Sequence, residues 1–254
     1  MIASPARHYL NGYRRCGGGK PLKYYPICLD ISEKPCVVVG GGEVAARKTL
    51  RLLECGAAVK VVAGEINAML REMAAAGRIS HLADNYDERC LDGAFLVIGA
   101  TDRAEVNDRI AADCRARGIL VNIVDDPQRC DFILPALLSR GSLSIAVATD
   151  GKSPALAKKL RRELAGRFGP EYAPYVELLG RLRELIVGAG RPADENRDVF
   201  TALVNSPLLD LLRAGHREEA RALIRDLTGL EVAANFVDGP EVRLTPLPGP
   251  EAKT

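Results

Sequence analysis

The chain has 254 residues, of which 47% are hydrophobic, and this is enough for one large or two modest domains with apolar cores. Its formal net charge of +2 excludes a general polyanion-binding protein, and no motif of stacked aromatic residues indicates nucleic-acid binding. No uninterrupted apolar run approaches the roughly 20 residues of a membrane span, and the basic N-terminus lacks the apolar segment of a signal peptide.

The seven cysteines all lie between Cys16 and Cys130, and none of them forms a C-x-x-C pair. Several fall inside apolar runs, which favours reduced, packed thiols in a cytoplasmic protein over disulfides or a zinc site. The three histidines, His8, His81 and His216, lie far from the motifs described below. We therefore predict no resident metal site.

The chain begins with a basic, glycine-containing segment, and the first predicted secondary structure follows it. Residues 1–23 are expected to be a flexible lead-in; a phosphate loop at Gly17-Gly18-Gly19 is the alternative, although no apolar strand precedes these glycines. The residue types of Tyr24 to Asp30 predict a strand, and Ser32-Glu33-Lys34-Pro35 predicts a turn.

The stretch Cys36 to Gly56 predicts a buried strand, a glycine turn and a helix. The spacing Gly40-x-Gly42-x-x-Ala45 is the dinucleotide-binding fingerprint, with alanine in its third place. Gly40 would make the tight turn, and Gly42 would let a pyrophosphate approach the backbone. Free N–H groups at the start of the helix would bind the phosphates. We therefore predict a nicotinamide dinucleotide cofactor whose diphosphate lies over Gly40 to Gly42.

Four further strands are expected at residues 58–63, 78–82, 94–100 and 119–124, with helices between them at 65–76 and 105–117. This alternation predicts a parallel sheet whose ligands lie at the carboxyl ends of the strands. The residues that this rule places on one rim are Gly40, Glu65, Thr101, Asp102, Asn122 and Asp125.

Glu65 has two interpretations that the sequence leaves open. It is close to the position from which an acid holds the adenosine ribose, and it could equally be a first-turn acid of the helix over 65–76. No arginine lies beside it to hold a 2′-phosphate, so NAD is preferred to NADP.

The pattern changes after Asp126. A strand is expected over 143–148, a helix from Pro154 to about Phe168 with Ser153 as its N-cap, and further helices over 170–187, 194–205, 207–214 and 217–227. The cations of the 154–168 helix indicate either a solvated face or an anion site. Residues 235–254, rich in proline and glycine, are expected to form a loosely held tail.

Several motifs occur together in one order and carry a resemblance. They are Tyr25-Pro26-Ile27, residues 39–45 with Arg47-Lys48, Ala100-Thr101-Asp102, residues 122–127, residues 130–135 and residues 151–157. Over about Tyr24 to Leu185 the chain resembles the precorrin-2 dehydrogenase family, the dehydrogenase module of sirohaem synthases.

The resemblance implies an α/β fold: a Rossmann-type NAD-binding domain at 24–135, a small dimerisation region at 136–168 and an α-helical domain at 169–234. It implies a homodimer that oxidises precorrin-2 to sirohydrochlorin with NAD⁺. One alternative is a bifunctional enzyme that also inserts ferrous iron into sirohydrochlorin. A second, from another class, is a non-catalytic NAD-sensing module.

The family's site residues carry over onto matching positions of this sequence. The cofactor contacts fall on Gly40, Gly41, Gly42, Glu43, Val44, Gly64, Glu65, Thr101 and Asp102, and the catalytic carboxylate falls on Asp125. The substrate carries acetate and propionate groups, for which Asn122, Arg140, Thr149, Lys152, Ser153 and Lys158 are the expected partners.

Overall fold

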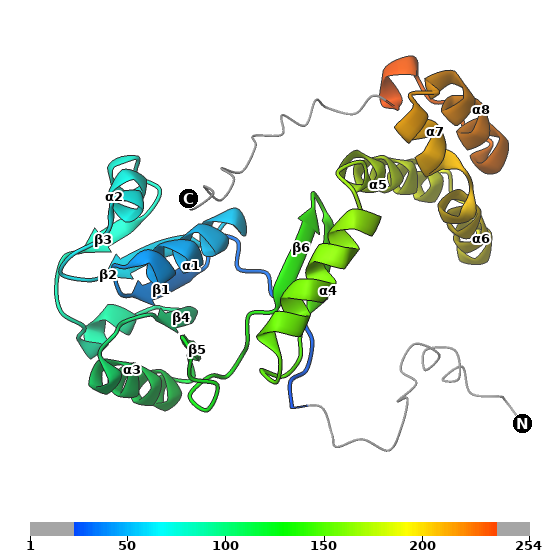
Figure 1. Ribbon diagram of the computed structural model, residues 1–254. Coiled ribbons are helices and arrows are strands. Elements are labelled where there is room, and N and C mark those ends of the chain that lie inside the picture. The colour runs from blue at the N-terminus through cyan, green and yellow to red at the C-terminus, as the bar shows by residue number, and fades with distance from the viewer. Residues whose placement is uncertain (1–22, 238–254) are drawn as a thin grey trace, which may run out of the picture. The chain divides into compact units, whose positions relative to one another are not determined.

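The computed structural model describes residues 23–237, and the chain divides into two compact units, Met1–Leu134 and Pro135–Thr254. Each unit is considered by itself (Figure 1). The lead-in at 1–23, apart from Lys23, and the tail beyond Val237 lie outside the described residues. None of the described helices is long and apolar enough to cross a bilayer.

The first unit is built on a sheet of five parallel strands, which confirms the α/β class. In spatial order the strands are β3 (Ser80–Leu82), β2 (Ala58–Val62), β1 (Pro35–Val39), β4 (Leu96–Gly99) and β5 (Leu120–Ile123). The strand order reverses beside β1, so a crevice is expected at its carboxyl end.

Alternate side chains of β1 enter two separate cores, because successive residues of a strand point to opposite faces. Cys36 and Val38 pack with α1 (Glu43–Glu54) and α2 (Ala68–Ala75) on one face. Val37 and Val39 pack with α3 (Ala104–Arg117) and the short 3₁₀ helix η2 (Glu88–Leu91) on the other. The sheet is thus covered on both sides, as Figure 1 shows.

Two local predictions for this unit are wrong. Tyr24 to Asp30 is not a strand: the segment is extended without a ladder partner, and Tyr25 and Ile27 are 83% and 64% exposed. The second helix begins at Ala68, not at Glu65, because Asn67 caps it: its side chain accepts a hydrogen bond from the Leu70 N–H at 2.9 Å.

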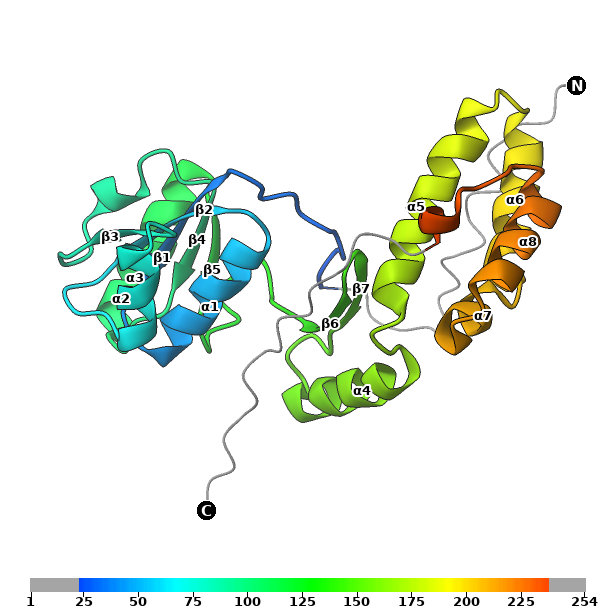
Figure 2. The ribbon, with the colours of Figure 1, turned by 90° about the horizontal axis from the view of Figure 1, so that it is seen from above.

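The second unit joins a β-hairpin to helices (Figure 2). Strands β6 (Ala136–Arg140) and β7 (Leu143–Val147) pair antiparallel, and α4 (Pro154–Arg167) packs on them. The remaining helices, α5 (Tyr172–Gly188), α6 (Ala193–Asn205), α7 (Leu208–Ala214) and α8 (Arg217–Thr228), enclose a leucine- and isoleucine-rich core.

The chain remains part of the packed core beyond residue 235, where its proline- and glycine-rich composition predicts a loosely held tail. Residues Ala234–Phe236 form the 3₁₀ helix η3, and Val237 is 9% exposed in the core of the helical unit. The loosely held tail therefore cannot start at 235. The separation of a dimerisation region from a helical domain stays a prediction.

Candidate active site

The three glycines after β1 have different reasons to be glycine. Gly40 has φ +132°, and a Cβ on it would lie 2.3 Å from the Ala100 carbonyl oxygen. A Cβ on Gly41 would lie 1.8 Å from the carbonyl oxygen of Glu65. Gly42 has an extended backbone with φ −86°, and nothing lies within 4 Å of where its Cβ would be. Two glycines thus allow close backbone packing, while the third borders open space.

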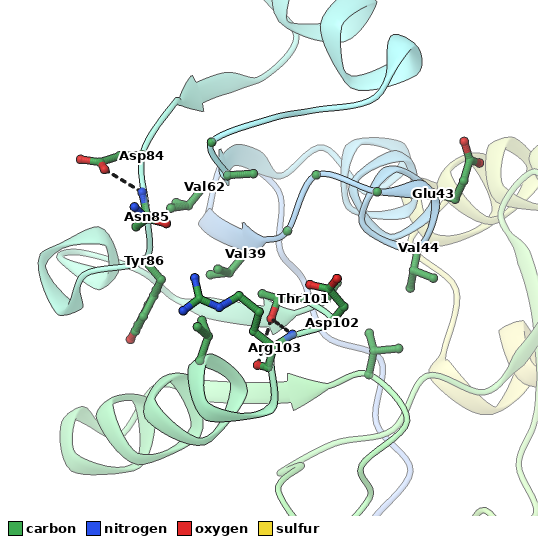
Figure 3. A pocket seen from close by; sticks show the side chains of 18 of the residues that line it. Val39, Glu43, Val44, Val62, Asp84, Asn85, Tyr86, Thr101, Asp102 and Arg103 are labelled. Carbon is green, nitrogen blue, oxygen red and sulfur yellow. Dashed lines mark hydrogen bonds between the residues drawn. The ribbon is translucent and has the colours of Figure 1, made fainter.

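That open space adjoins the N-terminus of α1. Gly42 caps the helix without a side chain, and its carbonyl accepts the first helical hydrogen bond, from the Ala46 N–H. The N–H groups of residues 43–45 therefore have no partner within the helix, and with the helix dipole they form an anion-binding position. In Figure 3 the Glu43 side chain points away from this space and Val44 points into it.

A cavity of about 550 Å³ lies over the carboxyl ends of β1, β2, β4 and β5 (Figure 3). This volume falls in the range of cofactor pockets. Its walls are formed by Val39, Gly40, Gly41, Gly42, Glu43, Val44, Val62, Ala63, Gly64, Asp84, Asn85, Tyr86, Ala100, Thr101, Asp102, Arg103, Val106, Val124 and Asp125. Every residue expected to contact the cofactor lines it except Glu65.

Glu65 lies in the loop before α2, and its side chain is exposed. The first turn of α2 contains no acid, so the helix-dipole interpretation is wrong. It is the Glu65 carbonyl, packed on Gly41, that meets the glycine turn. The cavity wall beyond β2 comes instead from Asp84, Asn85 and Tyr86, after β3. These three were missed, although they directly follow an expected strand and the rule for parallel sheets applies to them equally.

The turn after β4 is braced by its own side chains. The Thr101 hydroxyl oxygen accepts a hydrogen bond from the Arg103 N–H at 3.0 Å, and the Asn107 amide donates to the Thr101 carbonyl at 3.0 Å. Arg103 was also missed. Its guanidinium reaches toward the cavity in Figure 3, and its Nε lies 3.3 Å from Glu105. This turn therefore carries a cation, Arg103, next to the carboxylate of Asp102.

Asp125 lies on the rim in a left-handed conformation, with φ +62°. The loop that holds it is fastened at several points. Asp126 N–H donates to the Ile123 carbonyl, and the Arg129 guanidinium pairs with the Asp126 carboxylate at 2.7 Å. The Cys130 sulfur accepts from the Ile123 N–H at 3.2 Å, and burial raises the pKa of this thiol. The exposed carboxylate of Asp125 is thus presented by a rigid loop.

Asn122, expected to meet the substrate, is placed under this loop. It is 8% exposed, and its amide donates to the Phe132 carbonyl at 2.9 Å. Because β5 is buried on both faces, Asn122 lies in the interior. Asn122 is therefore not a substrate contact; it supports the Asp125 loop from below.

The expected substrate residues of the second unit lie on the hairpin and on the start of α4. The Arg140 guanidinium donates from Nε to the Phe168 carbonyl at 3.0 Å, so it fastens the end of α4. Ser153 is the N-cap as predicted: its hydroxyl accepts from the Leu156 N–H at 3.3 Å. Thr149 accepts from the Ser153 N–H at 3.1 Å. Lys152 and Lys158 are exposed.

Comparisons with known proteins agree with this geometry. Residues 27–136 match the family model described as "Putative NAD(P)-binding", and residues 140–167 match "Sirohaem biosynthesis protein central". The solved structure of SirC, a precorrin-2 dehydrogenase, superposes with a TM-score of 0.68 at 27% identity, covering 82% of this chain and 100% of that one.

Two curated relatives are siroheme synthases. That of Chromobacterium violaceum is 38% identical over 79% of this chain, and that of Photobacterium profundum is 34% identical over 82%. These matches confirm the resemblance to the precorrin-2 dehydrogenases and siroheme synthases. The chain spans less than half the length of these siroheme synthases, 43% and 44%. The NAD(P)-binding match confirms a nicotinamide cofactor.

Proposed function

We propose that the protein oxidises precorrin-2 to sirohydrochlorin with NAD⁺. The observation that carries this proposal is one cavity bounded at one end by the free N–H groups of α1 and bordered at its rim by Asp125. The match to SirC over that protein's full length supports the same chemistry.

The residues present fit a dinucleotide. Gly42 leaves room where a pyrophosphate must approach, and residues 43–45 offer unpaired N–H groups to it. When bound, NAD⁺ supplies a hydride acceptor. Oxidation of the macrocycle removes one hydride and one proton, so the chain must provide a proton acceptor. Asp125, an exposed carboxylate on a rigid loop, is our candidate for that base.

The charges around the cavity favour NAD over NADP. Asp84, Asp102 and Asp125 line the cavity, against the single cation Arg103 among the lining residues. An additional 2′-phosphate would bring two more negative charges into this surrounding, and like charges repel. We therefore infer that NAD is the cofactor.

We further propose that Lys152 and Lys158 bind carboxylates of the macrocycle, because both are exposed cations at the start of a helix. Thr149 and Ser153 would shape the turn beside these lysines. Arg140, at the end of β6, would contact a further carboxylate of the macrocycle. A homodimer and a cytoplasmic location complete the proposal. The six described cysteines, all free, are compatible with a reducing compartment.

The test is an anaerobic assay of precorrin-2 with NAD⁺, followed at the NADH absorbance. We expect NADH to form in step with sirohydrochlorin, and NADP⁺ to be a poorer acceptor. Cofactor binding without NADH formation would instead favour the NAD-sensing module. Iron insertion is the alternative second activity, with ferrous iron as substrate. Sirohydrochlorin and ferrous iron under nitrogen would then give the sirohaem spectrum faster than a protein-free control.

A further inference from the structure

Lys48 is a cation of the first unit to which the proposed reaction assigns no role. It lies on α1 one turn after Val44, and residues four apart share a helix face. Val44 lines the cavity, so Lys48 continues the same face of the helix away from the glycine turn. Its side chain is half-buried.

The loop that carries Asp125 lies on the same side of the sheet as α1. Val124 and Phe132, which flank that loop, pack against the core that contains Ala45 and Ala46 of α1. Burial lowers the pKa of the Lys48 ammonium, and the charge of Arg47 lowers it further. Asp125 and Cys130 act on that pKa in the opposite direction. Lys48 therefore feels the field of the Asp125 loop.

Lys48 has no compensating partner among the residues that the structure describes. Within residues 23–237 it forms no ion pair and no side-chain hydrogen bond, whereas Arg51 on the same helix pairs with Glu54 at 2.7 Å. Holding a half-buried charge without a partner costs free energy. Its ammonium is not fully buried, so a ligand can still reach it. Lys48 is not needed to bind the pyrophosphate, which the glycine turn serves.

We infer that Lys48 forms a carboxylate-binding subsite beside Asp125 that anchors an acidic side chain of the tetrapyrrole. This inference rests on the proposed function and adds a substrate contact within the first unit. An ammonium is a suitable partner for an acetate or propionate group, and charge-assisted contacts are the stronger class of hydrogen bond. Fixing one such group beside Asp125 would hold the macrocycle in register for proton removal.

The test measures binding of sirohydrochlorin, without nucleotide, by absorbance titration under nitrogen. We expect Lys48→Met to weaken its affinity about tenfold, equivalent to about 1.4 kcal/mol. Lys48→Arg should retain most of the affinity. Arg47→Met is the matched control, because it removes the same charge from the neighbouring, exposed position of α1; it should change the affinity less than twofold.

Two further measurements separate this role from a structural one. NADH affinity, read by its fluorescence, should be the same in Lys48→Met and wild type. The melting temperature of Lys48→Met should equal or exceed that of wild type, because the substitution removes an unpaired half-buried charge. A Lys48→Met protein that binds sirohydrochlorin as tightly as Arg47→Met, or that loses NADH equally, would overturn the subsite.

The outcomes also separate the subsite from the reaction. Wild-type NADH formation with unaltered binding in Lys48→Met would leave the dehydrogenase and remove the subsite. Lys48-dependent binding without NADH formation would leave the subsite and remove the dehydrogenase. A wild-type protein that does not bind sirohydrochlorin would overturn the subsite outright.

Discussion

Gly41 and Gly42 are neighbours in sequence, yet alanine at each should have opposite effects on folding and on cofactor binding. At Gly42 the backbone is in a conformation that alanine adopts freely, and the new methyl group meets nothing within 4 Å. Gly42→Ala should therefore fold, with stability equal to wild type or higher by up to about 1 kcal/mol through the unfolded chain.

The same methyl group would occupy the space that we assign to the pyrophosphate. If it displaces the phosphates enough to break two charge-assisted hydrogen bonds with the helix N-terminus, each worth about 1.5 kcal/mol at the low end, the loss is about 3 kcal/mol. That is roughly a 150-fold weaker NAD⁺ affinity. Gly41→Ala should instead destabilise the fold by about 1–3 kcal/mol or more, because its Cβ would lie 1.8 Å from the Glu65 carbonyl oxygen.

The assay pairs a NADH fluorescence titration with thermal denaturation for each variant. Gly42→Ala should lose affinity and keep its melting temperature, whereas Gly41→Ala should lose melting temperature. A Gly42→Ala protein that binds NADH like wild type would refute the placement of the pyrophosphate. One that fails to fold would refute our account of the open space.

Three other variants test the remaining features. Asp125→Asn should keep the wild-type melting temperature, since asparagine also tolerates φ +62°, while the rate of NADH formation falls at least about 100-fold; unchanged turnover would remove the base. Burial raises the pKa of Cys36 to about 11 and that of Cys114 to about 12. Both thiols ionise earlier in the unfolded chain, so the free energy of unfolding should be fully retained below pH 9 and decline as the pH rises through 11. Urea titrations of wild type and a Cys36→Ala/Cys114→Ala chain should show the shallower decline in the latter, and equal slopes would contradict this. Arg140→Met removes the bond to the Phe168 carbonyl and should cost about 1–2 kcal/mol, read as a lower melting temperature; no change would show that the end of α4 is held without it.

Local patterns predict the elements of this fold well where the information is itself local. The strand–glycine–helix unit over 36–56 and the Ser153 cap were both readable, because each depends on residues adjacent in sequence. The segment Tyr24 to Asp30 has the residue types of a strand but forms no ladder with another described segment. A strand needs a hydrogen-bonded neighbour as well as suitable residues, and the local sequence does not contain that neighbour.

The parts of the site that were misjudged depend on contacts between distant segments. The sequence cannot show that Glu65 would press its backbone on Gly41, 24 positions before it. The same limit applies to Asn122, whose partner is the carbonyl of Phe132. The start of α2 is different, because the Asn67 cap bonds the Leu70 N–H only three residues away and asparagine is a favoured N-cap, so this signal is local.

Asp125 shows why such distant contacts matter to catalysis. A left-handed conformation at a residue other than glycine costs about 1–2 kcal/mol, so it persists only where the surroundings enforce it. Here the loop is enforced by the Asp126 turn, by the Cys130 sulfur beneath it and by the Val121 N–H, which donates to the Asp131 carboxylate at 3.0 Å. A base that is held this way does not have to be immobilised when substrate arrives, so the conformational cost falls on folding rather than on the reaction step. The buried Asn122 belongs to the same apparatus, which explains why a polar residue occupies the middle of a core strand.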